Sequence, residues 1–292
     1  MKRFFFLCAF LTLTSVCAFA TPLKRSEIRA DHLYSKILGE DVGVNVYLPA
    51  GYDPDAARQY PVIYLLHGLY GVFTDWADKG RMKEPVDEMI ASGEAVPMII
   101  IMPNAGDPDV HHKWNGYLNM PGRPYEDFFF KELIPTFEAR YPIVGDKQHR
   151  AIMGLSMGGG GSTVYSQRHP DMFSSCYAMR AWLDQPDPKS ADPNDKLYIV
   201  RKSVRDHSAI RFVIDADEQT LDALRSVKWF FDCGDDDSLL DQTLQIYQEL
   251  RNRKVKAELR VRDGWHSWEY WHTALRQAIP FASRNFGAGS PG

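Results

Sequence analysis

Short apolar runs that alternate with helical patterns constrain the fold of this chain more than any other feature. The apolar runs predict strands at residues 44–48, 62–66, 98–102, 150–153, 173–178, 227–233 and 257–261. Several runs are apolar nearly throughout, which is typical of strands that helices cover on both faces. Strands separated by helices favour a parallel sheet. We therefore expect an α/β fold, with a mostly parallel central sheet and helices on both faces.

Two segments repeat apolar side chains at helical spacing, so each forms one buried stripe on a helix. One set is Phe129, Leu133, Phe137 and Tyr141, and the other is Leu240, Leu244, Tyr247 and Leu250. Pro135 interrupts the first set, and a proline inside a helix removes a backbone N–H. We therefore expect a kink at Pro135.

The stretch 180–225 does not fit the alternation. It is rich in Asp, Pro and Ser at first and helical only later. It is too long for a plain connection and too short for an independent domain, which predicts an insertion over the sheet. No repeat or Pro/Gly linker divides the rest of the chain, so residues 21–292 are interpreted as a single domain.

The first twenty residues have the pattern of a secretory signal. Lys2 and Arg3 precede the mostly apolar run 4–16, and small residues follow up to Ala20. The run is short for a membrane span, and no second long apolar stretch follows, so we expect no stable membrane anchor. A lipoprotein signal at Cys17 is the alternative, disfavoured because a bulky residue precedes it. Cleavage near Ala20 predicts a secreted or periplasmic protein.

Charge and cysteine content limit the possible partners. The net charge is −4, with 34 basic and 38 acidic residues, so the chain lacks the basic excess that binding to a nucleic-acid backbone requires. Beyond the signal, Cys176 and Cys233 remain, both inside apolar runs. That placement favours buried free thiols over a disulfide, although a bridge stays open. The cysteine spacing suggests no metal site. The sequence does not define an oligomeric partner.

The segment Gly154-Leu155-Ser156-Met157-Gly158 matches the pattern GxSxG. An apolar strand precedes it and a helix start follows, which is the setting in which a serine hydroxyl projects above a sheet at a sharp turn. The alternative is a glycine-rich turn that binds phosphate at a helix N-terminus, assisted by residues 159–161. No P-loop lysine follows, which disfavours that alternative. Ser156 is the candidate nucleophile.

A serine needs a base and an acid to become nucleophilic. His266 follows the last predicted strand and precedes the final helix, so it lies on a loop at the carboxyl edge of the sheet. For the acid, Asp237 is preferred among the aspartates that follow strand 227–233, and Asp236 is the main competitor. A helix-capping role for Asp237 is the other interpretation. The order Ser156, Asp237, His266 is that of the α/β-hydrolases.

When a serine oxygen attacks a carbonyl group, the carbonyl oxygen becomes negatively charged, and N–H donors are needed to stabilise this oxyanion. The backbone N–H of Met157, directly after the nucleophile, is one candidate. The second should come from the loop after strand 62–66, where Leu69 is the expected donor. The alternative is that residues 67–71 form a simple turn. Neither a cofactor nor a metal is required, and His266, Glu269 and His272 lack the spacing of a zinc motif.

Together these motifs resemble one protein family, the esterase D family. The matching segments are Leu65-Leu66-His67-Gly68, Gly154-Leu155-Ser156-Met157-Gly158, Cys233-Gly234 with Asp237, and the stretch that begins at His266. The family includes feruloyl and acetyl-xylan esterases of carbohydrate esterase family one, S-formylglutathione hydrolase, siderophore esterases and mycolyltransferases. The resemblance runs from about residue 43 to 283. It implies the α/β-hydrolase fold, and it assigns the acid to Asp237 and the nucleophile and base to Ser156 and His266. The insertion at 180–225, which we expect over the active-site edge, carries no motif of the family.

The sequence says less about the substrate than about the catalytic residues. The loop 104–123 mixes aromatic and polar side chains, so Trp114 and Tyr117 are candidate substrate-binding residues, as is Trp265 beside the base. A secreted location disfavours a cytosolic glutathione thioester. We expect a serine carboxylic-ester hydrolase that removes feruloyl or acetyl groups from plant polysaccharide through an acyl-enzyme. A mycolyltransferase-type acyltransferase, a siderophore esterase and an inactive binding module are the alternatives.

Overall fold

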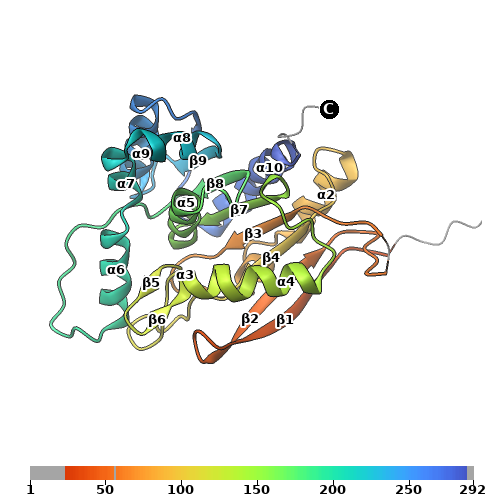
Figure 1. The fold of residues 1–292 in the computed structure, drawn as a ribbon, viewed down its shortest axis with the longest axis horizontal. Coiled ribbons are helices and arrows are strands. Elements are labelled where there is room, and N and C mark those ends of the chain that lie inside the picture. Colours follow the sequence, from red (N-terminus) through yellow and green to blue (C-terminus); the bar gives the residue numbers. More distant parts are fainter. Residues whose placement is uncertain (1–23, 56, 288–292) are drawn as a thin grey trace, which may run out of the picture.

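The computed structural model describes residues 24–55 and 57–287, and the predicted signal peptide lies outside them. Eight strands form one sheet in the order β1-β2-β4-β3-β7-β8-β9-β10 (Figure 1). Their bounds are β1 (Glu27–Ser35), β2 (Glu40–Leu48), β3 (Val62–Leu66), β4 (Ile99–Pro103), β7 (Arg150–Leu155), β8 (Ser175–Met179), β9 (Lys228–Gly234) and β10 (Ala257–Arg262). All pairs from β4 to β10 are parallel, and β2 is antiparallel to both of its neighbours.

The prediction of a mostly parallel sheet is confirmed, and each predicted strand overlaps an observed one. The sequence missed β1 at the sheet edge. Most of its side chains are exposed or only partly buried, so it shows no continuous apolar run. It also missed a small ribbon of β5 (Asn119–Met120) and β6 (Arg123–Pro124), which is too short to show a period.

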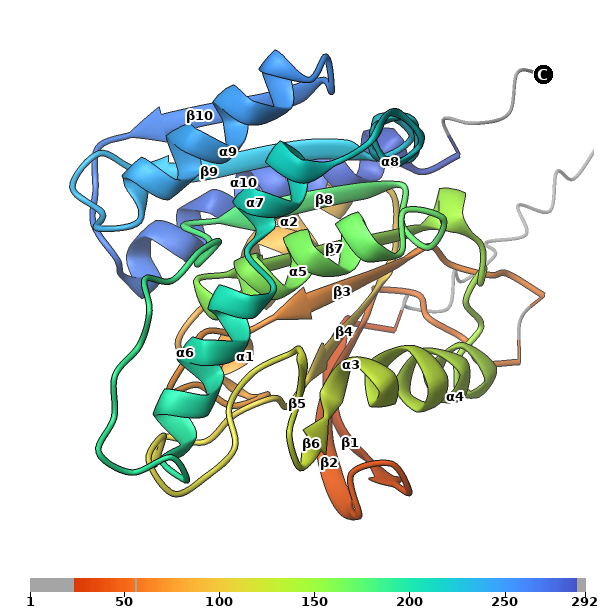
Figure 2. The same cartoon turned by 60° about the vertical axis from the view of Figure 1, so that its left-hand side comes forward.

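Helices cover both faces of the sheet (Figure 2). They are α1 (Asp75–Asp78), α2 (Lys83–Ser92), α3 (Tyr125–Phe128), α4 (Ile134–Arg140), α5 (Met157–Arg168), α6 (Lys196–Asp206), α7 (Ala209–Asp215), α8 (Glu218–Arg225), α9 (Leu240–Asn252) and α10 (Trp268–Asn285). A short 3-10 turn spans Lys147–His149. Among the described residues, no helix combines the length and apolar character needed to cross a membrane.

Alternation along the central strands builds a separate core on each face. In β3, Tyr64 and Leu66 join the core beneath α3, α4, α5, α7 and α9, whereas Ile63 and Leu65 join the core beneath α2 and α10. Successive side chains of a strand point to opposite faces, so a strand that is apolar throughout fills both cores. This explains why the central runs carry no polar alternation.

The helix predicted to kink at Pro135 is irregular at that point. A π-helical turn, Phe129–Leu133, lies between α3 and α4, and Pro135 is the second residue of α4. A proline lacks the N–H that an α-helical bond from this position would need, and a π-helical turn re-routes the bonding there. The predicted kink therefore takes the form of a π-helical turn.

Three short helices make up the later part of the insertion at 180–225. Each begins at a side chain that accepts a hydrogen bond from a backbone N–H of the first turn: Asp195 caps α6, Ser208 caps α7 and Asp217 caps α8. Such caps satisfy N–H groups that have no partner inside the helix. The Asp- and Ser-containing stretches between the helices therefore define where each helix begins.

The two described cysteines are free and buried, as the sequence predicted. Burial raises the pKa of Cys176 to about 12 and that of Cys233 to about 11. Since the thiolate is the reactive form, both side chains behave as small apolar groups at neutral pH.

Candidate active site

The structure brings Ser156, His266 and Asp237 together at the carboxyl edge of the sheet. The Ser156 hydroxyl lies 3.0 Å from His266 Nε2, and His266 Nδ1 lies 2.7 Å from Asp237 Oδ2. Both distances are within hydrogen-bonding range. The serine is the residue before α5, the aspartate follows β9, and the histidine lies between β10 and α10. This is the geometry in which imidazole accepts a proton from a serine hydroxyl.

Ser156 lies on a sharp turn that glycines make possible. Its φ is 52° and its ψ is −116°, a conformation that non-glycine residues rarely adopt. A Cβ atom at Gly158 would lie 2.5 Å from the carbonyl oxygens of Leu66 and His67, and one at Gly154 would lie 2.5 Å from the backbone of Gly158. Side chains at these two positions would therefore push β3 and α5 away from the turn.

The carboxylate of Asp237 is held by three donors. Its Oδ1 accepts the Leu239 N–H at 2.8 Å, and its Oδ2 accepts both His266 and Arg180, the latter at 2.7 Å. Burial alone would raise the pKa of Asp237, but hydrogen bonds from His266, the Leu239 N–H and Arg180 lower it to about 2. Asp236, the competing candidate, is exposed. The geometry thus assigns the place beside His266 to Asp237, which also contributes a backbone bond before α9.

The two predicted oxyanion donors belong to the segments next to the serine hydroxyl. Met157 is the first residue of α5, and Leu69 belongs to the loop after β3 that lines the same cavity as Ser156. Neither N–H has a hydrogen-bond acceptor among the residues that the structure describes. The adjacent Tyr70 has a φ of 63°, so the backbone turns sharply directly after Leu69.

His67 holds the loop that carries Leu69. Its ring is buried, its Nδ1 lies 2.8 Å from the Gly68 carbonyl, and its Nε2 accepts the Ala105 N–H at 2.9 Å. These contacts require a neutral ring with the proton on Nδ1. Burial lowers the pKa of His67 to about 4. Tyr117 donates its hydroxyl proton to the His67 carbonyl at 3.1 Å, so this loop is fixed from two directions.

His67 should make the folded protein sensitive to acid. The unfolded chain binds a proton near the ordinary pKa of 6.5, whereas the folded chain binds it only near 4. The contribution is therefore fully present above pH 6.5 and is lost as the pH falls to 4. Over this window the free energy of unfolding should decrease by about 2 to 3 kcal/mol. Urea unfolding at several pH values measures the decrease.

The matched variants for this pH dependence are His67→Gln and His112→Gln. His112 is an exposed histidine whose side chain contacts Asp109. The His67 variant should be less stable at pH 7 but should lose less stability between pH 6.5 and 4 than the wild type. The His112 variant should keep the wild-type dependence. Equal slopes for wild type and the His67 variant would contradict the assignment.

A cavity of about 480 Å³ opens above Ser156. Its lining combines the loop after β3, the residues around the triad and part of the insertion: Gly68, Leu69, Tyr70, Gly71, Asp75, Lys79, Leu155, Ser156, Trp182, Gln185, Arg201, Ser238, Leu239, His266, Trp268 and Trp271. The volume falls in the usual range for small-molecule sites. The insertion, which has no recognisable motif, therefore contributes Trp182, Gln185 and Arg201.

The three predicted substrate-binding aromatics lie outside this lining. The Lys196 ammonium group lies over the Trp114 ring in a cation–π contact, with Nζ 3.8 Å from the ring centroid. Tyr117 is buried, with its hydroxyl bonded to the backbone of His67. Trp265 is 66% exposed beside His266. The wall of the cavity is instead built from Trp182, which the sequence did not single out, and from the aromatic residues at the start of α10.

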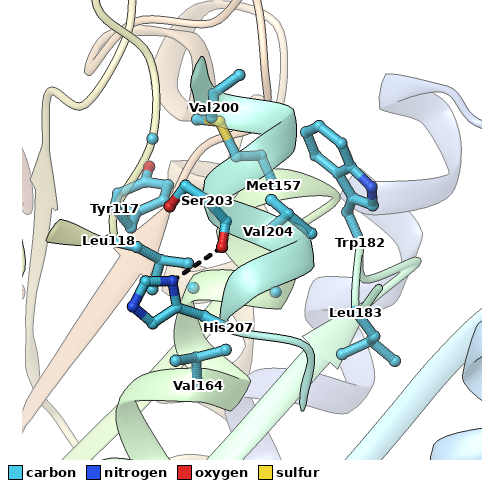
Figure 3. A pocket seen from close by; sticks show the side chains of 13 residues that line it. Tyr117, Leu118, Met157, Val164, Trp182, Leu183, Val200, Ser203, Val204 and His207 are labelled. Atoms are coloured by element: carbon cyan, nitrogen blue, oxygen red, sulfur yellow. Dashed lines mark hydrogen bonds between the residues drawn. The ribbon is translucent and has the colours of Figure 1, made fainter. Parts of the chain in front are cut away.

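A second, apolar crevice lies beneath α6, next to the serine turn (Figure 3). Met157 and Trp182 face Val200 and Val204 of α6 there. Its interior has a volume of about 20 Å³, close to that of one water molecule. We interpret the crevice as the packing contact that holds Trp182 and α6 beside the active site.

Sequence reasoning assigned no role in the site to the side chains of His67 and Arg180, although His67 lies in a segment that it singled out. Both follow parallel strands directly, β3 and β8, at the carboxyl edge where active sites of α/β proteins gather. That position is the signal by which they could have been found. The sequence does not reveal their partners, because Ala105 and Asp237 come from distant parts of the chain.

A serine, histidine and aspartate in this order and geometry, at the carboxyl edge of a mostly parallel sheet, define a serine hydrolase of the α/β-hydrolase fold. The chain belongs more narrowly to the esterase family, since the family model described as "Putative esterase" matches residues 35–282.

Relatives of known structure and sequence agree with this family. A solved ferulic acid esterase superposes with a TM-score of 0.88 at 49% identity, over 90% of this chain and 99% of that one. An endo-1,4-beta-xylanase/feruloyl esterase of Xylanibacter ruminicola is 31% identical over 159 residues, which is 53% of this chain and 22% of that protein. An acetyl esterase of Caldicellulosiruptor saccharolyticus is 22% identical over 87% of this chain and 97% of its own length.

Proposed function

We propose that this protein is a feruloyl esterase that acts on plant polysaccharide. The observation that carries the proposal is the 49% identity to a ferulic acid esterase across nearly the whole of both chains. The xylanase/feruloyl esterase of Xylanibacter ruminicola supports the carbohydrate part, although this chain matches only 22% of that protein.

The cavity above Ser156 fits an aromatic acyl group. Trp182, Trp268 and Trp271 line it, and flat apolar side chains pack well against a planar ring. Polar side chains also line the cavity: Ser156, His266, Asp75, Lys79, Gln185, Arg201 and Ser238. Such a cavity offers apolar area for the ring and a few polar groups for its substituents, the usual composition of a small-molecule site.

The first half of the reaction follows from the geometry. His266 Nε2 removes the proton from the Ser156 hydroxyl, and the serine oxygen attacks the ester carbonyl. The N–H groups of Leu69 and Met157 stabilise the negative oxygen that forms. When the carbon–oxygen bond to the sugar breaks, His266 returns the proton to the leaving alcohol. The product is a feruloyl group bound to Ser156.

Water completes the cycle by the same steps. His266 takes a proton from water, the resulting hydroxide attacks the acyl-enzyme carbonyl, and the proton then returns to the Ser156 oxygen. Asp237 stabilises the imidazolium in both halves through its bond to Nδ1. Ferulic acid leaves and the free serine is restored. No step needs a group beyond these residues.

Substrate ranking tests the proposal. We expect kcat/KM for methyl ferulate to exceed that for methyl acetate by at least about tenfold, because only the former fills the aromatic wall. Trp182→Ala should reduce methyl ferulate turnover about tenfold and methyl acetate turnover far less. Trp114→Ala, outside the cavity, is the matched control. A preference for acetate, or equal effects of Trp182→Ala on both esters, would contradict the feruloyl assignment.

Product analysis separates a hydrolase from an acyltransferase. With feruloylated arabinoxylan oligosaccharides as donor, the proposal predicts free ferulic acid as the main product, with or without an added sugar acceptor. Transfer to the acceptor as the main reaction would favour the acyltransferase. We also propose export, with cleavage near Ala20, because the first twenty residues have the signal pattern. Sequencing of the mature N-terminus checks this.

A further inference from the structure

Arg180 is a buried cation directly behind the catalytic pair. Its side chain is 0% exposed, and its Nη1 donates to Asp237 Oδ2 at 2.7 Å. That same oxygen accepts the hydrogen bond from His266. Arg180 Nε and Nη2 have no hydrogen-bond partner in the described part of the chain. Within that part, the guanidinium therefore directs its one polar bond to the carboxylate that holds the histidine.

From this geometry we propose that Arg180 is a positioning residue of the active site. It fixes the Asp237 carboxylate in the rotamer that orients His266, and it offsets part of the negative charge that would otherwise hold a proton on the imidazole. The inference rests on the proposed function, since it assumes that His266 acts as the base.

Two glycines, Gly234 and Gly264, lie next to the Arg180 guanidinium. A Cβ atom at Gly234 would lie 2.1 Å from Arg180 Nη2, and one at Gly264 would lie 3.2 Å from it. Gly234 is the last residue of β9, directly before the loop that carries Asp237, and Gly264 lies in the loop that carries His266. A Cβ atom at Gly234 would also lie 2.0 Å from the Gly264 carbonyl oxygen, so a side chain there would displace both Arg180 and the loop that carries His266.

The backbone also fixes Arg180 in place. Its φ is 46°, a left-handed conformation, and its N–H donates to the Asp232 carbonyl at 2.7 Å. Two residues later the Trp182 N–H donates to the Ser156 carbonyl at 2.9 Å. The segment is thus tied to β9 on one side and to the serine turn on the other, so Arg180 cannot shift without disturbing them.

Fold stability alone does not account for a buried arginine with one hydrogen bond. Replacing a buried ion pair by apolar side chains is often neutral or stabilising, so such a pair is weak evidence for a stabilising role. Tyr270 partly compensates the charge, because the Arg180 guanidinium lies 3.5 Å from its ring centroid. Arg262 lies 3.3 Å from the same ring centroid, and its guanidinium donates to the Tyr270 carbonyl rather than to Asp237. It is a natural control.

Charged and titratable groups surround Arg180 from several elements. Asp232 of β9 accepts the Tyr270 hydroxyl and that of Tyr177 from β8. Cys233 precedes the loop that carries Asp237. Arg262 ends β10, and His266 follows it. Asp237 is the residue that forms hydrogen bonds with both Arg180 and His266. A substitution at Arg180 should therefore alter the orientation and protonation of His266 through the Asp237 carboxylate.

The experiment compares Arg180→Met, Arg180→Lys and Arg262→Met in the full chain with methyl ferulate as substrate. Active sites are counted with a fluorophosphonate, so that only folded and competent molecules contribute. Arg180→Met should lower kcat about 100-fold and leave KM within about twofold, because Arg180 does not line the substrate cavity. In a plot of kcat/KM against pH, the fall of activity on the acidic side (the acidic limb) should also shift to higher pH by about one unit. The reason is that a cation no longer opposes protonation of the base.

Arg180→Lys keeps the charge and should leave the acidic limb within about 0.3 unit of wild type, even where kcat falls. Arg262→Met should lower the melting temperature without moving the limb. Arg180→Gln replaces the methionine variant where that variant fails to fold. The inference would be overturned if the acidic limb of Arg180→Met or Arg180→Gln stayed at the wild-type pH. It would also be overturned if Arg180→Lys shifted the limb as far as these uncharged replacements do. A wild-type enzyme that hydrolyses no ester would instead refute the proposed function.

Discussion

Ser156→Ala is expected to lower kcat for methyl ferulate by about 10⁵- to 10⁶-fold while leaving substrate affinity nearly unchanged. The hydroxyl is 3.0 Å from the base, and the acyl-enzyme cannot form without it. The N–H groups of Leu69 and Met157 remain, so a small residual rate above that of water should persist. Steady-state kinetics and loss of fluorophosphonate labelling measure the effect.

Ser162→Ala is the matched control for this prediction. Ser162 is also a serine of the turn and α5 region, but it is buried and its hydroxyl donates to the Gly158 carbonyl within the helix. Both variants should fold, with circular dichroism spectra like that of the wild type. Only Ser156→Ala should lose labelling and turnover. Retained labelling in that variant would place the nucleophile elsewhere.

The serine turn could be predicted because its chemistry and its geometry are both local. A strand, a turn with glycines at two fixed positions and a helix start follow one another within the sequence. The structure adds the reason for the glycines, since Gly158 passes within van der Waals contact of the carbonyl groups at the end of β3. Sequence alone shows the glycines and not the strand that they approach.

The substrate cavity could not be predicted in the same way. An aromatic residue indicates apolar surface but not the cavity that it faces. Tyr117 and Trp182 illustrate this point. Tyr117 supports the His67 loop from a buried position, whereas Trp182 lines the cavity from an insertion without a motif. Which ring reaches the substrate depends on long-range packing, such as the contact of α6 with the serine turn.

The choice between adjacent carboxylates needed three-dimensional information as well. Asp236 and Asp237 have the same chemistry and nearly the same position after β9. The structure separates them, because the loop turns so that Asp236 faces solvent and Asp237 faces His266 and Arg180. The distinction follows from burial and from the partners, neither of which a sequence pattern records.

Asp237→Asn is expected to lower kcat by about 10⁴-fold. Where the amide nitrogen of the new side chain faces Nδ1 of His266, the ring proton moves to Nε2, which can then no longer accept the proton of Ser156. The variant should also be less stable, because the buried Arg180 would lose the carboxylate that it is paired with, at a cost of about 3 kcal/mol. Kinetics with methyl ferulate and thermal unfolding measure the two effects.

Asp236→Asn removes the same charge from the neighbouring residue and tests whether the effect depends on position. Asp236 is exposed, unlike the buried Asp237. The variant should keep kcat within about twofold and the wild-type melting temperature, since exposed charges contribute little to stability. A large loss of kcat in Asp236→Asn, with Asp237→Asn near wild type, would mean that the loop after β9 presents the other carboxylate to His266 during catalysis. The observed hydrogen bonds oppose that outcome, because Asp237 Oδ1 is already bound to the Leu239 N–H and its Oδ2 to both Arg180 and His266.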